Sequence, residues 1–171
     1  LQTPTHTQNW PSPEGWQVFP IIGLDCELHV VLLLSSHPSL SMPYRLLLLG
    51  AGRSASSLIR YLLQHAPPEN WHLTVADVHP SHLGPVLAEH SQYARAVAFD
   101  IQNEARLGEL VQETDLVISM LPALFHAQVA RACLRYKRHL ATASYVSEAI
   151  RELDLEAQQA GITFLMECGL D

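Results

Sequence analysis

The sequence predicts an α/β fold, a doubly wound parallel sheet of about six strands with helices on both faces. From residue 45 onward, short and wholly apolar runs alternate with helical patterns. A continuous apolar run is typical of a parallel strand that helices bury on both faces. Strands that alternate with helices are joined by right-handed crossovers, which make the sheet parallel. The first apolar run, residues 46–49, also leads into a glycine turn before a helical pattern.

Each element follows from the apolar spacing along the chain. Strands are expected at residues 46–49, 71–76, 95–99, 116–120, 140–143 and 162–166. Helices are expected at residues 54–64, 81–90, 103–112 and 123–136. A last helix follows Ser147 and carries Ile150, Leu153, Ala157 and Ala160 on one face. Pro67 and Pro68 are expected to end the first helix, and Gly161 to cap the last one.

The glycine turn at residues 50–55 has the form Gly-x-Gly-x-x-Ala. Gly50 allows a tight turn, Gly52 lets backbone approach a pyrophosphate, and the small Ala55 lets the helix sit close to the strand. The first N–H groups of that helix would face the phosphates. The motif alone also occurs in ordinary turns, but the strand before it and the helix after it favour a Rossmann dinucleotide-binding domain.

Asp77 stands at the end of the second predicted strand, close to the roughly 20-residue spacing at which an acid meets the adenosine ribose. Its carboxylate can accept hydrogen bonds from both ribose hydroxyls and repels a 2′-phosphate. The alternative is that Asp77 only turns a loop or caps a helix, as Asp often does. The order of strand, glycine turn, helix and strand favours the ribose role.

The composition narrows the classes of protein and the partners to be expected. The chain has 171 residues, 48% hydrophobic and 16% charged, with a net charge of −7, so we expect one globular domain and no nucleic-acid partner. The dispersed cysteines Cys26, Cys133 and Cys168 are expected to be reduced in a cytoplasmic protein. The histidines lack metal-ligand spacing, and no metal is expected. No apolar run is long enough to span a membrane.

Residues 1–43 are predicted to be an irregular extension, and residues 44–171 the dinucleotide-binding domain. The extension is rich in Thr, Gln and Pro, and its apolar run at residues 28–34 follows acidic instead of basic residues, which disfavours a signal peptide. Met42 precedes the first strand and is the expected natural start, with residues 1–41 non-native. The alternative is a genuine additional strand or arm.

Residues 45–171 resemble the N-terminal cofactor domain of the saccharopine dehydrogenase (L-glutamate-forming) family, also called saccharopine reductase. The matching pieces are Leu-Leu-Gly-Ala-Gly at 48–52, Asp-Leu-Val-Ile-Ser-Met-Leu-Pro at 115–122 with Phe125-His126, His-Leu-Ala-Thr-Ala-Ser-Tyr-Val-Ser at 139–147, Ala-Gly-Ile-Thr at 160–163 and Glu-Cys-Gly-Leu-Asp at 167–171. The resemblance implies an oxidoreductase of lysine metabolism, which reversibly reduces the imine of glutamate with 2-aminoadipate semialdehyde to saccharopine.

The resemblance also implies roles for residues that follow the strands. Ser144, Leu170 and Asp171 fall where substrate binds, and Tyr145 and Asp171 are candidates for proton transfer. The residues implied to bind NAD or NADP are Gly50, Ala51, Gly52, Arg53, Asp77, Phe99, Asp100, Met120, Leu121, Pro122 and Ala143. Tyr145 could instead only pack beneath the nicotinamide, and Asp171 could only cap a turn. Ser144 is expected to donate a hydrogen bond instead of acting as a nucleophile, because no His or Asp is placed to activate it. His126 is as well explained by a structural role as by a contact.

Two departures from the family pattern bear on cofactor and substrate. Relatives continue past Gly-Leu-Asp into Pro-Gly-(Ile/Leu)-Asp-His and a large substrate domain, through which a homodimer is possible. Fungal members carry Cys-Arg where this chain has Ala76-Asp77, which favours NAD here.

Two alternative functions stay open: a nucleotide-sensing Rossmann module without chemistry, and a sister imine reductase that resembles carboxynorspermidine dehydrogenase.

Overall fold

A computed structural model describes residues 42–168 and shows a six-stranded parallel sheet. The strand order is β3-β2-β1-β4-β5-β6 and every neighbouring pair is parallel. This confirms the predicted doubly wound fold. The strands are β1 (Tyr44–Leu49), β2 (Trp71–Asp77), β3 (Ala94–Ala98), β4 (Leu116–Ser119), β5 (His139–Thr142) and β6 (Phe164–Leu165).

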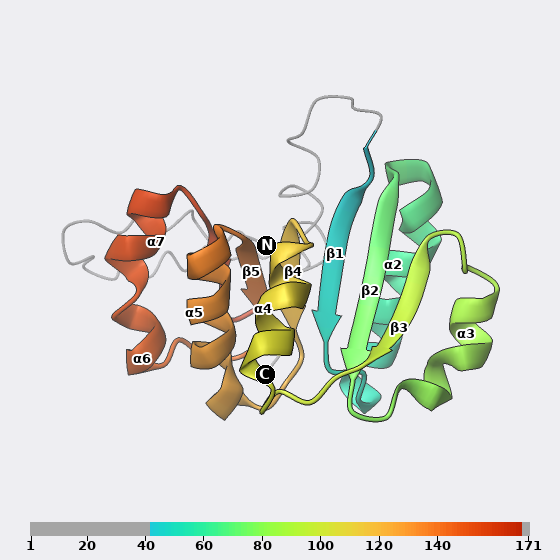
Figure 1. Cartoon of the computed structure of the whole chain (residues 1–171), viewed down its shortest axis with the longest axis horizontal. Coiled ribbons are helices and arrows are strands. Elements are labelled where there is room, and N and C mark those ends of the chain that lie inside the picture. The colour runs from blue at the N-terminus through green and yellow to red at the C-terminus, as the bar shows by residue number, and fades with distance from the viewer. Residues whose placement is uncertain (1–41, 169–171) are drawn as a thin grey trace, which may run out of the picture. The chain divides into compact units, whose positions relative to one another are not determined.

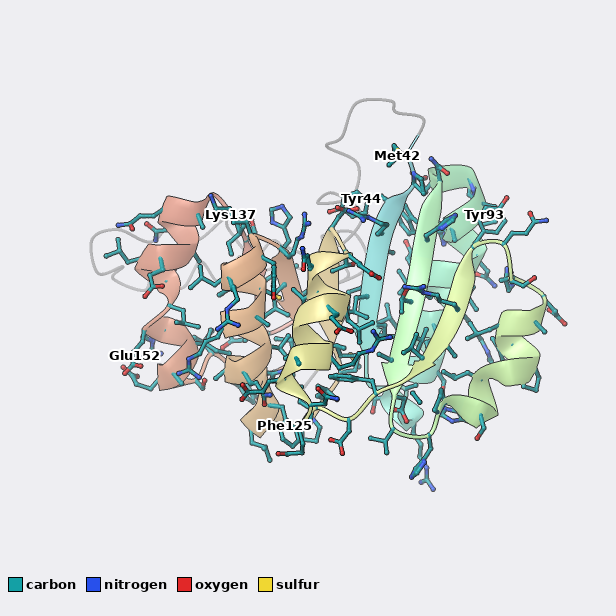
Figure 2. The ribbon with its side chains drawn as sticks, viewed as in Figure 1. Met42, Tyr44, Tyr93, Phe125, Lys137 and Glu152 are labelled. Atoms are coloured by element: carbon teal, nitrogen blue, oxygen red, sulfur yellow. The ribbon has the colours of Figure 1, made fainter. Side chains whose placement is uncertain are left out.

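β1 lies at the centre of the sheet, between β2 and β4, where the direction of winding reverses (Figure 1). Its last four residues are buried, as expected for a strand covered on both faces. Leu49 aligns with Ala76 of β2 and with Ser119 of β4. The carboxyl ends of these strands therefore meet at one edge of the sheet, called here the carboxyl edge. Figure 2 shows Phe125 at this edge, and Tyr44 and Tyr93 at the opposite edge.

Helices cover both faces of the sheet. In Figure 1, α4 and α5 lie in front of the sheet and α2 lies behind it. The described helices are η1 (Arg53–Ala55), α2 (Ser56–Glu69), η2 (Pro80–Leu83), α3 (Gly84–Ala88), α4 (Glu104–Gln112), η3 (Ala123–Phe125), α5 (His126–Tyr136), α6 (Glu148–Arg151) and α7 (Asp154–Ala160). Among these residues, no helix is long and apolar enough to cross a membrane.

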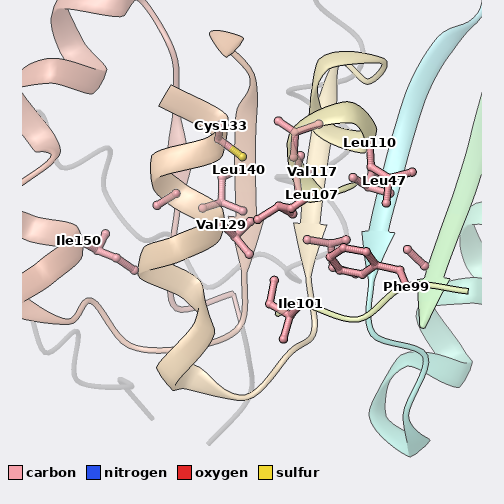
Figure 3. Close-up of a cluster of buried hydrophobic side chains, with 14 of the residues drawn as sticks. Leu47, Phe99, Ile101, Leu107, Leu110, Val117, Val129, Cys133, Leu140 and Ile150 are labelled. Atoms are coloured by element: carbon pink, nitrogen blue, oxygen red, sulfur yellow. The ribbon is translucent and has the colours of Figure 1, made fainter. Parts of the chain in front are cut away.

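One cluster of buried apolar side chains holds α4, α5 and α6 on the front face (Figure 3). Leu47 of β1 and Val117 of β4 face Leu107 and Leu110 of α4, while Val129 of α5 lies nearby in the same cluster. Full burial of one such leucine or valine stabilises the fold by about 1.5–3 kcal/mol. The front layer is therefore fixed against the sheet, and α5 begins at the carboxyl edge.

The prediction that the two prolines end the first helix is wrong. α2 continues through Pro67 and Pro68 to Glu69 and ends at Asn70, whose φ of 54° is left-handed. The prolines lack two N–H donors, but they stand in the last turn and are exposed. The buried residues Leu63 and Ala66 hold this turn against the sheet, so packing outweighs the lost hydrogen bonds.

The last predicted helix is two short helices, α6 and α7. The amide of Leu153 bonds to the carbonyl of Ile150 at 3.0 Å, a three-residue turn that interrupts the helical ladder. Ile150, Leu153 and Ala157 are nevertheless buried together, which confirms the predicted apolar face. Gly161 caps α7 with a φ of 68°, as expected. The predictions for residues 1–41 and for Gly169, Leu170 and Asp171 lie outside the described residues.

Candidate active site

The carboxyl edge brings together the segments that follow four strands. The amide of Gly50 bonds to the carbonyl of Ala76 at 2.8 Å, and the amide of Met120 to the carbonyl of Leu49 at 2.8 Å. The ends of β1, β2 and β4 are thereby tied to one another. Residues 143–146 follow β5, the neighbour of β4. Ligands of doubly wound sheets bind outside such an edge, at the point where the winding reverses.

The two glycines of the turn differ in whether the fold itself requires them. Gly50 has a φ of 89°, and a Cβ there would lie 3.1 Å from the carbonyl oxygen of Met120, so the fold itself requires glycine. Gly52 has φ −66° and ψ −177°, which any residue adopts, and a Cβ there would meet nothing within 4 Å. The backbone at Gly52 is therefore open, as a cradle for a pyrophosphate must be. Arg53, which begins η1, is exposed beside it.

Asp77 joins the glycine turn to the end of β2. One carboxylate oxygen accepts a hydrogen bond from the amide of Ala51 at 2.8 Å, and the other from the amide of His79 at 2.8 Å. Burial alone would raise the pKa of Asp77, but these two amides, with His82 and His79 nearby, bring it below its ordinary value. Both readings of Asp77 therefore fit: it turns the loop, and its remaining lone pairs can accept from a ligand.

His82, which the sequence reasoning missed, completes this corner. Its Nε2 lies 3.1 Å from the carbonyl oxygen of Ala51, and its Nδ1 lies 2.8 Å from that of His79. A neutral imidazole can donate only one of these hydrogen bonds, whereas an imidazolium donates both. The available signal was the position of His82 in η2, the short helix that follows β2 and places this side chain beside the glycine turn.

A second polar group lies at the ends of β4 and β5. His126, the first residue of α5, is buried, and its Nδ1 is 3.0 Å from Ser119 Oγ. Its Nε2 is 2.8 Å from Ser144 Oγ and 3.2 Å from Thr142 Oγ1. The expectation that no histidine stands beside Ser144 is wrong, because β4 and β5 are neighbours and α5 begins over their ends.

This pair nevertheless does not make Ser144 a nucleophile. Burial lowers the pKa of His126, which disfavours the imidazolium that a general base becomes. Within residues 42–168, the hydrogen-bond partners of the imidazole are three hydroxyls, and no carboxylate stabilises its charged form. The prediction that Ser144 forms hydrogen bonds instead of attacking a substrate remains, now with a different reason.

The other predicted residues lie at the same edge in different environments. Phe99 is buried in the front core, so its side chain is closed to a ligand, and its amide bonds to the carbonyl of Asp77 at 2.9 Å. Asp100 is exposed and accepts from the amide of Gln102 at 2.9 Å. Around them, Met120 and Leu121 are half-buried, and Pro122 and Ala143 are exposed.

Tyr145 extends from the edge with 66% of its surface exposed. Glu167 holds the segment around it, since its amide bonds to the carbonyl of Ser144 at 3.0 Å and its carboxylate accepts from the amide of Val146 at 3.3 Å. The side chains of Ser144 and Tyr145 thus come from a loop fixed on both sides. The structure brings them to the predicted edge, and their chemical roles remain predictions.

Other features of the described residues lie apart from this site. A hollow of about 420 Å³ opens at the opposite edge, between the starts of β1 to β3 and the end of α4, lined by residues that include Arg45, Tyr93 and Glu113. It contains none of the predicted site residues. Among residues 42–168, no group of three or more His, Cys, Asp or Glu side chains could hold a metal ion.

Comparisons with known proteins agree with the geometry. Residues 46–165 match the family described as saccharopine dehydrogenase NADP binding domain. The chain is 45% identical over 80 residues to saccharopine dehydrogenase (NADP(+), L-glutamate-forming) of Pyricularia oryzae, covering 47% of this chain and 18% of that protein. It is 33% identical over 150 residues to the alpha-aminoadipic semialdehyde synthase of Arabidopsis thaliana, covering 78% of this chain and 14% of that protein.

A solved structure supports the same grouping. Apo saccharopine dehydrogenase (L-Glu forming) from Saccharomyces cerevisiae superposes with a TM-score of 0.65 at 32% identity, covering 75% of this chain and 28% of its own. The chain thus spans less than a third of the length of these relatives. The preference for NAD expected from Asp77 is not supported, because the family description names NADP.

Proposed function

Because this chain belongs to the saccharopine dehydrogenase family, we propose that its Rossmann domain binds NAD(P) and serves an oxidoreductase of lysine metabolism. The observation that carries the proposal is the open backbone at Gly52 beside Asp77. The fold imposes glycine at position 50 but not at position 52, where space is left free. A pyrophosphate at the turn uses that space, and the first amides of η1 supply donors for it, since the first amide of α2 already donates to the carbonyl of Arg53.

The adenosine ribose belongs at Asp77 in this proposal. The carboxylate keeps lone pairs beyond those used by Ala51 and His79, so it can accept from a ribose hydroxyl. His79 and His82 place imidazoles within the field of the same carboxylate. A cationic imidazole favours a 2′-phosphate and the carboxylate opposes it. This corner therefore determines the choice between NAD and NADP.

The nicotinamide end belongs over the ends of β4 and β5. When bound, this ring supplies or accepts the hydride that interconverts the imine and the secondary amine of saccharopine. The chain's own residues orient the substrate: the Ser144 hydroxyl is fixed by His126, and Tyr145 stands exposed next to it. Tyr145 is the proposed proton donor or relay, and Asp171 the second proton-transfer candidate.

The proposal is tested by titrating NADP+ and NAD+ into the chain by calorimetry. Wild type is expected to bind at least one of them, and Gly52→Val to lose that binding while circular dichroism stays unchanged. Gly84→Ala is the matched control, since a Cβ at Gly84 also meets nothing within 4 Å but lies at the start of α3. A folded wild type that binds neither cofactor at millimolar concentration would exclude the proposal.

A further inference from the structure

Two side chains, one from the end of β2 and one from η2, hold both polar backbone groups of Ala51 in the middle of the glycine turn. The Asp77 carboxylate accepts from the amide of Ala51 at 2.8 Å, and Nε2 of His82 lies 3.1 Å from the Ala51 carbonyl oxygen. Nδ1 of the same ring lies 2.8 Å from the carbonyl oxygen of His79. His82 therefore bridges the glycine turn after β1 and the loop after β2.

The carbonyl of Ala51 belongs to the peptide unit that carries the amide of Gly52. The described residues contain no cis peptide bond, and in a planar trans unit the C=O and N–H groups point in opposite directions. A hydrogen bond that fixes the Ala51 carbonyl thus also fixes the direction of the Gly52 N–H. Within residues 42–168, the Gly52 amide donates to no protein group, so this N–H is open to a ligand.

Both contacts of the His82 ring are to carbonyl oxygens, which only accept hydrogen bonds. The imidazolium has two N–H groups and donates to both carbonyls. Either neutral form has one N–H, so it leaves one carbonyl without its donor, and a nitrogen lone pair then faces an oxygen lone pair. This result is the same whichever nitrogen of the neutral ring carries the proton. The bridge from η2 to the glycine turn is therefore complete only when His82 is charged.

The charged groups around His82 come from the elements packed against η2 and from the glycine turn. Asp77, at the end of β2, interacts electrostatically with both His82 and His79, and its low pKa keeps it charged near neutral pH. The other charged or titratable side chains of β2, β3 and η1 are His72, Arg95 and Arg53, and α3 has none. Arginine stays charged throughout. Between about pH 5 and 8 the groups of these elements that titrate are therefore histidines, and in the described residues only His82 among them bonds to the glycine turn.

We propose that His82 is a positioning residue for the cofactor: its charged ring holds the Ala51 carbonyl and thereby directs the Gly52 amide to the pyrophosphate. The inference rests on the proposed function in that the pyrophosphate binds at the glycine turn. Protonation of His82 then strengthens binding of any cofactor with this pyrophosphate, including NAD+, which lacks the 2′-phosphate. The bridge between His82 and the glycine turn is a property of the chain itself.

NMR of the 15N-labelled chain without any ligand tests the bridge. As the pH falls from about 8 to about 5, the range in which histidine titrates, the Gly52 amide resonance is expected to shift with the same midpoint as the His82 ring, because the bonded carbonyl shares its peptide unit. His82→Gln should remove this shift. His79→Gln, which keeps the His79 carbonyl, should retain it. A Gly52 resonance that does not follow the His82 titration, or that loses its shift only in His79→Gln, would overturn the inference.

Calorimetric titration of NAD+ tests the consequence for the cofactor, because NAD+ has no 2′-phosphate that a cationic imidazole could attract directly. Wild type is expected to bind NAD+ about fivefold more tightly near pH 6 than near pH 8, the effect of about one hydrogen bond, and His82→Gln to lose this difference. His72→Gln, on an exposed residue of β2, should keep it. A pH dependence in His82→Gln equal to that of wild type would contradict the inference. Failure of wild type to bind either cofactor would count against the proposed function, while the NMR result still decides the inference.

Discussion

The carboxylate of Asp77 lies 2.8 Å from the amide nitrogen of Ala51, so the acid at the end of β2 fixes the middle of the glycine turn after β1. The same side chain therefore shapes the pyrophosphate cradle and borders the proposed ribose site. Any substitution of Asp77 changes both. A test of its role in cofactor choice must separate a general loosening of the turn from a change in specificity, and a ratio of two affinities does so.

We expect Asp77→Ala to lower the ratio of NAD+ affinity to NADP+ affinity by about ten- to hundredfold. The variant loses charge-assisted hydrogen bonds to the ribose diol, worth roughly 1.5–3 kcal/mol, and also loses repulsion of a 2′-phosphate. Loosening of the turn weakens the binding of both cofactors equally, so its effect cancels in the ratio of the two affinities. Calorimetric titration of both cofactors into wild type and variant measures it.

Asp154→Ala is the control, because Asp154 lies in α7, which holds no predicted cofactor residue, and its carboxylate accepts from the side chain of Gln158 at 2.9 Å. Its cofactor ratio should equal that of wild type. A ratio in Asp77→Ala that also equals wild type would mean that Asp77 only turns the loop.

The stabilising effect of Asp77 is expected to depend on pH. Because its pKa is lower in the folded chain than the ordinary 3.8, the stabilisation is complete above that value and is lost as pH falls through the lower folded pKa. Asp77→Ala should reduce the free energy of unfolding by about 1 kcal/mol at pH 7. Urea unfolding followed by circular dichroism should show this difference shrinking below pH 4. A difference that grows in acid would contradict the assignment.

The sheet and its carboxyl edge could be predicted because burial on both faces leaves a simple apolar signal, as in residues 46–49. Helix ends were harder to predict. Pro67 and Pro68 carry a local signal to stop, and the burial of Leu63 and Ala66 in the folded domain overrides it. Local preference therefore failed where tertiary burial decided the outcome.

In the site, too, local sequence spacing could be read and tertiary contacts could not. Gly50, Gly52 and Asp77 have spacings that encode their places, so the sequence predicted where they meet. The contact between His126 and Ser144 joins two residues from different elements, and it depends on β4 and β5 being neighbours. The sequence predicted the two strands but not their order in the sheet, and it could not predict the rotation of α5 that turns the imidazole inward.

Alanine at the two turn glycines is expected to affect the stability of the fold differently. Gly50→Ala should destabilise the fold by at least about 1 kcal/mol, because its φ of 89° is strained for alanine and its Cβ would press on the Met120 carbonyl. Gly52→Ala should leave stability near wild type, because its conformation is ordinary and its surroundings are open. Thermal unfolding separates the two. Equal destabilisation would show that the fold, not a ligand, requires both glycines.

Asp115 should stabilise the fold without affecting the cofactor, since it lies at the edge opposite the proposed site. It accepts from the amide of Arg45 at 2.9 Å and from its guanidinium at 3.1 Å, which ties the start of β1 to the start of β4. Asp115→Ala is expected to lower the free energy of unfolding by about 1–2 kcal/mol.

Glu113→Ala is the matched control, because its ion pair with Arg95 is exposed on both sides and such pairs contribute less than about 1 kcal/mol. Urea unfolding measures both variants, and the ratio of NAD+ to NADP+ affinity should stay at the wild-type value in each. A loss for Glu113→Ala as large as that for Asp115→Ala would show that net charge, not this strand-to-strand contact, sets the stability of that edge.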